Sequence, residues 1–209
     1  MKVPVNFARV STVALLSLSL ASLGSAQAVP GADKAAAGQT APIRIDNFGR
    51  VSATYYRGAQ PEGRDYADLA ALGVKTVINL TSFDAMADEP GLVEAAGMKY
   101  VAMPMTTRVT PTPEQLAAFL EIVNDPKQQP VFVHCVGGKH RTGVMTAVYR
   151  MTEGGWSSQQ AFKEMKQYKY GADFLHPEFK KFVYGYRVST PAVIPVTAPV
   201  DVAATTLAD

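Results

Sequence analysis

The residues best suited to chemistry stand in one short stretch, 131–143, which reads VFVHCVGGKHRTG. A run typical of a buried strand leads to Cys135, and five residues separate that cysteine from Arg141. We expect this spacing to form a loop between a strand and a helix, with backbone N–H groups turned inward and the positive end of the helix facing them. The stretch therefore predicts an anion-binding loop with a nucleophile at its floor.

Cys135 is the nucleophile, and this setting activates it. A thiol is mostly protonated at neutral pH, whereas Lys139, Arg141, the N–H groups and the helix start all favour the thiolate. The planar guanidinium of Arg141 can bind two oxygens of a phosphoryl group at once. These groups predict attack of sulfur on phosphorus, a phosphocysteine intermediate and its hydrolysis.

The other loop residues have supporting roles. We expect the Thr142 hydroxyl to donate to the sulfur as it leaves, and the His134 ring to brace the loop. Gly137 and Gly138 allow the backbone to turn tightly. No cluster of ligands has the spacing of a metal site, so neither metal nor cofactor is expected. The predicted phosphate-binding residues are Val136, Gly137, Gly138, Lys139, His140 and Arg141, with Arg108 as a candidate substrate contact from a facing loop.

The composition indicates an exported globular protein. Of the 209 residues 47% are hydrophobic and 18% charged, which fits one domain. Residues 1–28 resemble a cleaved signal peptide, with Lys2 and Arg9 at the start, a short apolar run and a small-residue cleavage pattern. Without that segment 18 basic residues balance 18 acidic ones, so binding to nucleic acid or membrane is not expected. We predict a periplasmic or secreted location.

Cys135 is the single cysteine of the chain. Exported proteins that use cysteines for stability use them in pairs, so a lone cysteine in this loop indicates reactivity. The competing interpretation is a buried structural thiol, which the neighbouring glycines, arginine and helix start disfavour.

Alternating strand and helix patterns fill the rest of the chain and predict an α/β sheet. We expect strands at 48–51, 54–57, 75–80, 100–102 and 130–133, and helices near 66–72, 90–96, 113–123, 142–151, 158–168 and 177–186. Thr112 and Ser157 are the expected caps of two of these helices. The predicted division is a signal peptide at 1–28, a linker at 29–44, one globular domain at 45–188 and a disordered tail at 189–209.

The segment from His134 to Gly143 resembles the signature of the cysteine-dependent tyrosine and dual-specificity phosphatases. The segments YRGAQP at 56–61 and LGVKTVINL at 72–80 are similar to those of small bacterial members, and the resemblance covers residues 45–187. It implies a central, mostly parallel sheet flanked by helices, no metal, and hydrolysis of phosphomonoesters on tyrosine or dual-specificity protein substrates. The expected partner is a phosphorylated protein or small molecule, and we expect a monomer.

The proton donor of that family is missing. In the family an aspartate usually stands on the loop before the preceding helix, but here residues 103–112 contain no carboxylate. His140, inside the phosphate loop, is our preferred donor, because an imidazolium can give a proton near neutral pH. Glu114, Asp84 and Asp88 are weaker candidates; without a donor, the enzyme would act on good leaving groups such as phenols or phosphoanhydrides.

Three other functions remain open. A rhodanese-like sulfurtransferase also holds a cysteine in an anion loop, although Thr142 and Gly143 favour a phosphatase. A non-catalytic phosphate-binding module would explain the missing acid but would leave Cys135 without purpose. An inositol polyphosphate or pyrophosphate phosphatase would explain the basic rim formed by Lys139 and His140, although an exported protein would rarely meet such substrates.

Overall fold

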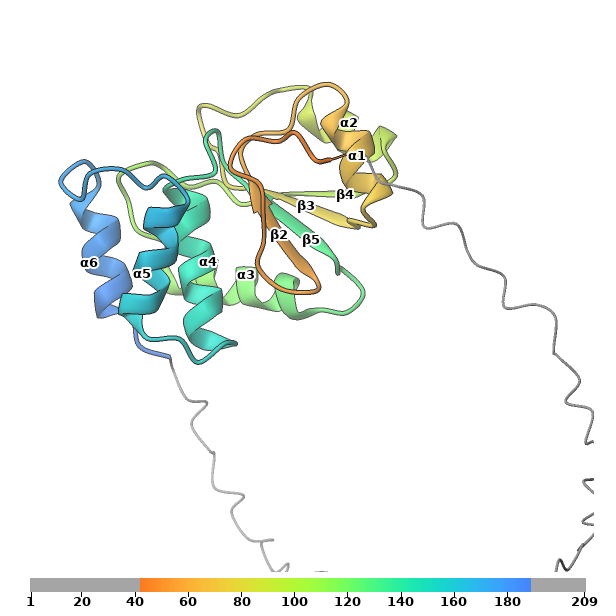
Figure 1. Ribbon diagram of the computed structural model, residues 1–209. Coiled ribbons are helices and arrows are strands. Elements are labelled where there is room, and N and C mark those ends of the chain that lie inside the picture. The colour runs from red at the N-terminus through yellow and green to blue at the C-terminus, as the bar shows by residue number, and fades with distance from the viewer. Residues whose placement is uncertain (1–41, 189–209) are drawn as a thin grey trace, which may run out of the picture. The chain divides into compact units, whose positions relative to one another are not determined.

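The computed structural model describes residues 42–188, which contain five strands and six helices (Figure 1). The strands are β1 (Gly49–Arg50), β2 (Tyr55–Gly58), β3 (Thr76–Asn79), β4 (Lys99–Ala102) and β5 (Val131–His134). The helices are α1 (Asp65–Ala71), α2 (Glu89–Ala95), α3 (Pro113–Asn124), α4 (Arg141–Thr152), α5 (Ser158–Gln167) and α6 (Pro177–Gly185). The predicted signal peptide, the tail at 189–209 and all but residues 42–44 of the linker lie outside the described residues.

The strands form one sheet in the order β1-β2-β5-β3-β4. The last four are parallel to one another, and the short β1 pairs antiparallel with β2, so the sheet is mixed. The predicted α/β fold with a mostly parallel sheet is therefore confirmed. Strands β3 and β5 are buried along their whole length, as expected for parallel strands covered on both faces.

Helices cover both faces of this sheet (Figure 1). Alternate residues of a strand point to opposite faces. On one face Val77 and Phe132 pack with Leu69 of α1, and on the other Ile78 and Val133 pack with Phe119 of α3. The register brings the carboxyl ends of β2, β5 and β3 together at one edge.

Helix α4 is the innermost helix. Residues 141–148 are all buried, because one side faces the sheet and the other packs on α5 and α6. The first turn of α4, directly after the loop that follows β5, is thus packed against the protein interior. Capping boxes at Thr112 and Ser157 begin α3 and α5, which confirms both expected caps.

The structure corrects the element boundaries only slightly. The first predicted strand, 48–51, shrinks to two residues, and the second shifts by one residue to end at Gly58. Among residues 42–188 no helix is both long enough and apolar enough to cross a membrane.

Candidate active site

The loop of residues 135–140 joins β5 to α4, as predicted. Cys135 begins it with a side chain only 3% exposed, and Arg141 is the first residue of α4. Val136 and Lys139 face outward and are exposed. The structure therefore brings Cys135 and Arg141 together at the carboxyl edge of the sheet, where open α/β sheets bind ligands.

Carbonyl groups of the loop accept hydrogen bonds from residues 47–60, the segment that contains β2. Arg57 Nη2 donates to Gly138 O at 2.5 Å, Asn47 Nδ2 donates to the same oxygen at 2.9 Å, and the Gln60 N–H donates to Val136 O at 3.1 Å. In a trans peptide the C=O and the following N–H point in opposite directions. Fixing these carbonyls outward turns the N–H groups of the next residues toward the inside of the loop, where an anion would lie.

Arg57 is the main brace. Its side chain is fully buried, and its guanidinium lies 4.0 Å above the Tyr168 ring. Burial lowers the pKa of Arg57, and the cation–π contact and the Gly138 carbonyl partly compensate for the lost hydration. Arg57 is not among the predicted site residues, although an arginine within a strand pattern is a usable signal.

Gly138 is the glycine that the loop requires. Its φ is +61°, and a Cβ at this position would lie 2.4 Å from the backbone of Gly58. At Gly137 a Cβ would meet only the flexible side chain of Lys139, at 3.5 Å. The tight approach of the loop to β2 thus depends on one of the two predicted glycines.

Arg141 is held by a carboxylate. Its Nη1 donates to Asp84 Oδ1 at 2.9 Å and its Nη2 donates to Asp84 Oδ2 at 2.6 Å, while Nη1 also donates to Met105 O at 3.2 Å. The hydrogen bonds from Arg141 lower the pKa of Asp84 to about 2. Burial lowers the pKa of Arg141, but Asp84 and the neighbouring Cys135 outweigh burial and raise it. The Nε–Nη2 edge of the guanidinium is left for a phosphate.

Thr142 and His134 flank the two reactive residues and are fully buried. The Thr142 hydroxyl has no hydrogen-bond partner among the described residues. His134 Nε2 lies 3.0 Å from Glu89 Oε1, behind the loop. Neither ring nitrogen of His134 has a hydrogen-bond partner among the described residues, so its bracing role stays a prediction.

His140 lies differently from what its predicted role requires. Its Nε2 lies 2.9 Å from Tyr170 O, and because a carbonyl only accepts, that nitrogen carries a proton. Burial, with the charges of His176 and Lys139, lowers the pKa of His140 despite the Tyr170 carbonyl. The ring is therefore neutral at neutral pH, with no second proton to give, which argues against His140 as the proton donor.

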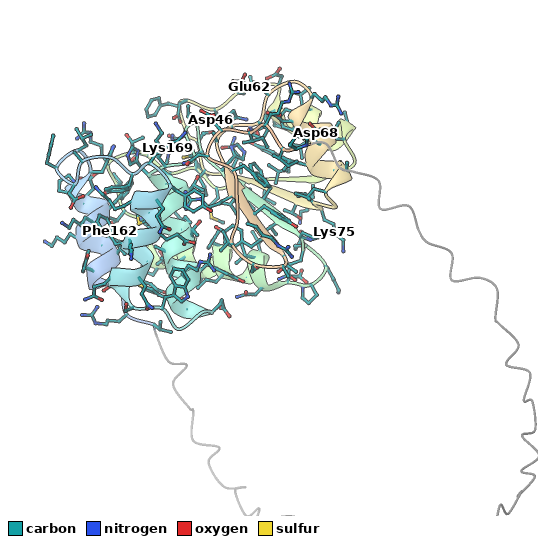
Figure 2. All side chains as sticks on the ribbon, viewed as in Figure 1. Asp46, Glu62, Asp68, Lys75, Phe162 and Lys169 are labelled. Carbon is teal, nitrogen blue, oxygen red and sulfur yellow. The ribbon has the colours of Figure 1, made fainter. Side chains whose placement is uncertain are left out.

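The other predicted residues lie at the margin. Arg108 and Glu114 are exposed, and Asp88 is exposed at the start of α2. A pocket of about 490 Å³ opens beside the loop, and Asp46, Glu62 and Lys169 line it on one side of the molecule (Figure 2). Residues 42–188 contain no group of three or more His, Cys, Asp or Glu side chains that could hold a metal.

Fold and site together define the class of dual-specificity and tyrosine phosphatases. A family described as "DSP-PTPase phosphatase fused to NAD+ Kinase" matches residues 44–181, and the chain belongs to this family. The match includes the entire sheet, the Cys135 loop and most of α6.

Named relatives agree with this assignment. The dual specificity protein phosphatase TpbA of Pseudomonas aeruginosa UCBPP-PA14 is 33% identical over 125 residues, which is 60% of this chain and 56% of TpbA. Inositol diphosphatase SIW14 of Saccharomyces cerevisiae is 27% identical over 133 residues, which is 61% of this chain and 47% of SIW14. The chain thus aligns with only about half the length of these relatives.

Solved structures show the same fold. The catalytic domain of S. cerevisiae SIW14 in complex with citrate has a TM-score of 0.60 at 25% identity, covering 68% of this chain and 86% of that one. A variant of P. aeruginosa TpbA in complex with phosphotyrosine has a TM-score of 0.58 at 28% identity, covering 66% and 83%.

The ion pair between Asp84 and Arg141 predicts a pH-dependent contribution to stability. The folded-state pKa of Asp84, about 2, is below its ordinary value of 3.8. The contribution is therefore complete above the unfolded-state pKa and is lost as pH falls through the folded-state pKa. We expect Asp84→Asn to lower the free energy of unfolding by about 1–2 kcal/mol at pH 7, and this deficit to shrink between pH 5 and pH 2.

Urea denaturation of both proteins across this pH range is the measurement. Asp88→Asn, which removes an exposed carboxylate from the same loop, is the control and should leave stability nearly unchanged. A deficit for Asp84→Asn that stays constant from pH 7 to pH 3 would contradict the ion-pair account.

Proposed function

We propose that this chain is a cysteine-dependent phosphatase that hydrolyses phosphomonoesters, with phosphotyrosine or dual-specificity protein substrates. One observation carries the proposal. Buried Cys135 and the guanidinium of Arg141 lie at the two ends of a loop whose carbonyls are fixed outward by Arg57, Asn47 and Gln60. Such a loop offers a dianionic phosphate its N–H groups and a nucleophile at the same point.

The first chemical step transfers the phosphoryl group to the enzyme. The phosphate oxygens bind the loop N–H groups and the Nε–Nη2 edge of Arg141, while Asp84 holds the opposite edge of the guanidinium. The Cys135 thiolate attacks phosphorus in line, the S–P bond forms, and the P–O bond to the leaving group breaks. The leaving oxygen departs with the electron pair of that bond.

The second step returns the enzyme to its starting state. A water molecule attacks phosphorus, the S–P bond breaks and inorganic phosphate is released. The sulfur regains its negative charge, and the otherwise unpartnered Thr142 hydroxyl can donate a hydrogen bond to it. This step gives Thr142 the role expected from the sequence.

The leaving group determines the substrate class. Asp84 is ionised beside Arg141, and His140 is neutral with its proton bound to Tyr170 O. Without a side chain ready to give a proton, the site suits leaving groups that are stable as anions. Phenolate is such a group, and TpbA, a relative of the same fold, has been crystallised with phosphotyrosine.

An inositol pyrophosphate phosphatase is the second candidate. A phosphoanhydride also leaves without a proton, the relative SIW14 is named an inositol diphosphatase, and Arg44, Lys139 and Lys169 line the pocket beside the loop. The same pocket carries Asp46, Glu62 and Asp65, whose charges oppose a polyphosphate. We therefore place phosphotyrosine substrates first.

The proposal also covers where the protein acts and its oligomeric state. The pattern of residues 1–28 supports a small exported bacterial phosphatase that acts in the periplasm or outside the cell, away from the membrane after cleavage. The proposed assembly state is a monomer. Cell fractionation with sequencing of the mature N-terminus tests the export, and the presence of the intact leader in the cytoplasmic fraction would refute it.

The nucleophile is tested by Cys135→Ser. We expect kcat/KM for an aryl phosphate to fall by at least about 10³-fold, because the serine hydroxyl is a far weaker nucleophile in a loop built for a thiolate. Inorganic phosphate should still raise the melting temperature of the variant, because the loop N–H groups and Arg141 remain.

Two outcomes would contradict this assignment. Hydrolysis retained in Cys135→Ser would refute the covalent mechanism. Wild-type protein that binds phosphate but hydrolyses no ester would support the non-catalytic module instead.

The absence of a ready proton donor predicts a strong dependence on the leaving group. We expect aryl phosphates to be hydrolysed at least about 10²-fold faster than phosphoserine peptides, because general acid catalysis is worth about that much. His140→Ala should leave the ratio of the two rates unchanged. If phosphoserine is hydrolysed as fast as the aryl ester, or if His140→Ala slows only phosphoserine, His140 or another group supplies the proton.

A further inference from the structure

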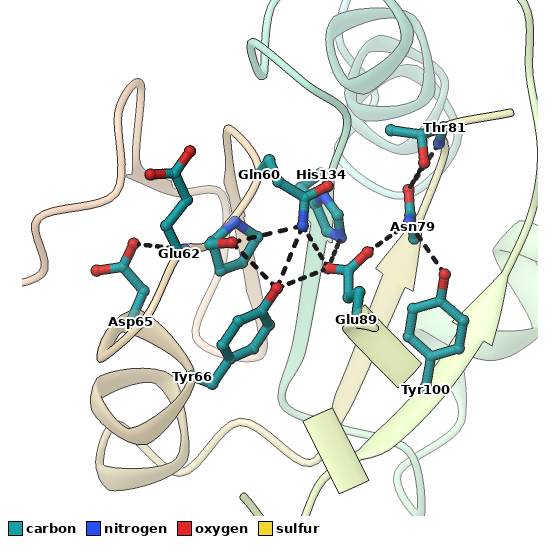
Figure 3. Close-up of polar contacts among 10 residues, drawn as sticks. Gln60, Glu62, Asp65, Tyr66, Asn79, Thr81, Glu89, Tyr100 and His134 are labelled. Carbon is teal, nitrogen blue, oxygen red and sulfur yellow. Dashed lines mark hydrogen bonds and ion pairs between the residues drawn. The ribbon is translucent and has the colours of Figure 1, made fainter. Parts of the chain in front are cut away.

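The fully buried side chain of Glu89 lies among the side chains of Gln60, Asn79 and His134 (Figure 3). Its Oε1 accepts from Gln60 Nε2 at 2.7 Å and lies 3.0 Å from His134 Nε2, and its Oε2 accepts from Asn79 Nδ2 at 2.5 Å. The Tyr66 hydroxyl makes a longer contact of 3.4 Å with Oε1. The mechanism given above leaves this carboxylate without a role.

Three side chains in contact with Glu89 come from the ends of three neighbouring strands. Gln60 follows β2, His134 ends β5 and Asn79 ends β3, and the register sets Gly58 and Asn79 directly opposite His134. A buried carboxylate is tolerated only when such partners replace its hydration. One carboxyl group therefore contacts the ends of the three strands from which the loops of the site begin.

The first connection runs through His134 to the nucleophile. The ring of His134 lies against the same carboxyl oxygen that accepts from Gln60 Nε2. Glu89 Oε1 lies 3.0 Å from Nε2, and this close contact limits the orientation of the ring. The next residue in the chain is Cys135, so the ring orientation sets the start of the loop.

The second connection runs through Gln60 to the loop carbonyls. The side chain of Gln60 is bound to Glu89, and its backbone N–H donates to Val136 O at 3.1 Å. Holding Gln60 in place therefore holds the Val136 carbonyl outward and the following N–H inward.

The third connection runs through Asn79 to the arginine. With Nδ2 bound to Glu89, the Asn79 Oδ1 accepts from the Thr81 N–H at 2.7 Å and from the Thr81 hydroxyl at 2.6 Å. Thr81 starts the segment that places Asp84 on Arg141. The same carboxylate thus also fixes the origin of the segment that orients the guanidinium.

We propose that Glu89 is a positioning residue for phosphoryl transfer, which aligns Cys135, the loop N–H groups and Arg141 through His134, Gln60 and Asn79. The proposal rests on the phosphatase function proposed above. Glu89 does not touch the substrate, so its removal acts on the alignment of the reacting groups, which small displacements impair strongly.

The test compares Glu89→Gln with a matched control, Glu164→Gln. Glu164 is also a buried carboxylate, held by Arg150 at 2.7 Å, but Arg150 lies at the far end of α4 from the loop. We expect Glu89→Gln to lower kcat for an aryl phosphate about 10- to 100-fold with KM changed less than about threefold. Glu164→Gln should lower the melting temperature comparably and leave kcat within about twofold of wild type.

Alkylation of Cys135 by iodoacetamide supplies a readout that is independent of turnover. We expect its pH–rate profile to shift in Glu89→Gln and to stay unchanged in Glu164→Gln. Equal losses of melting temperature in the two variants, with wild-type kcat and alkylation in Glu89→Gln, would overturn the positioning role.

Two cases need a separate reading: a Glu89→Gln variant that does not fold, and a wild-type protein without phosphatase activity. If Glu89→Gln does not fold, Gln60→Ala is the alternative variant, because it removes the side-chain hydrogen bond to Glu89 and keeps the backbone N–H of residue 60. We expect kcat of this variant to fall at least about threefold. An unchanged kcat would overturn the proposal. If wild-type protein hydrolyses no phosphate ester, the phosphatase function fails, whereas the alkylation profiles still decide the role of Glu89.

Discussion

The direction of the peptide groups in residues 135–140 is the constraint on which the rest of the site depends. Two donors from the β2 side, Arg57 Nη2 and Asn47 Nδ2, bind the Gly138 carbonyl and hold it outward. That approach is close enough to exclude a Cβ at Gly138. A buried arginine is costly in any fold, and here its position is explained by the anion-binding face that it produces on the other side of the loop.

The second constraint is the balance of charge around Arg141. A buried guanidinium needs a partner, and Asp84 supplies one on the Nη1–Nη2 edge without covering the edge that faces Cys135. The same interaction keeps Asp84 ionised. While Asp84 orients Arg141 it is ionised, so it has no proton to give to a leaving group. The way in which the arginine is held therefore favours leaving groups that need no proton.

The strand, the loop and the helix that form the site could be predicted from the sequence, because their sequence patterns are local. The strand, the loop with Cys135 and Arg141, and the helix behind it are contiguous, and Thr112 begins its helix with a capping box as expected. The residues that hold the loop and Arg141 in place, Arg57 and Asp84, could not be predicted in this way. Arg57 lies 81 residues from Gly138 in the chain, and Asp84 lies 57 residues from Arg141. Such pairings depend on strand order and register, which a single sequence does not specify.

His140 illustrates the same limit. Its type and its place in the loop favoured a proton donor, but the carbonyl that binds its ring comes from Tyr170, beyond α5. The direction in which a side chain points from a loop is decided by elements that arrive later in the chain, so residue type alone could not assign its role.

Capture of the covalent intermediate tests the central claim most directly. Wild-type protein is mixed with an aryl phosphate, denatured in detergent within the first turnover, and its peptides are analysed by mass spectrometry. The account predicts one phosphoryl group on the peptide that contains Cys135, and none on that peptide in Cys135→Ser. Turnover that proceeds without a phosphoryl group on Cys135 would contradict it.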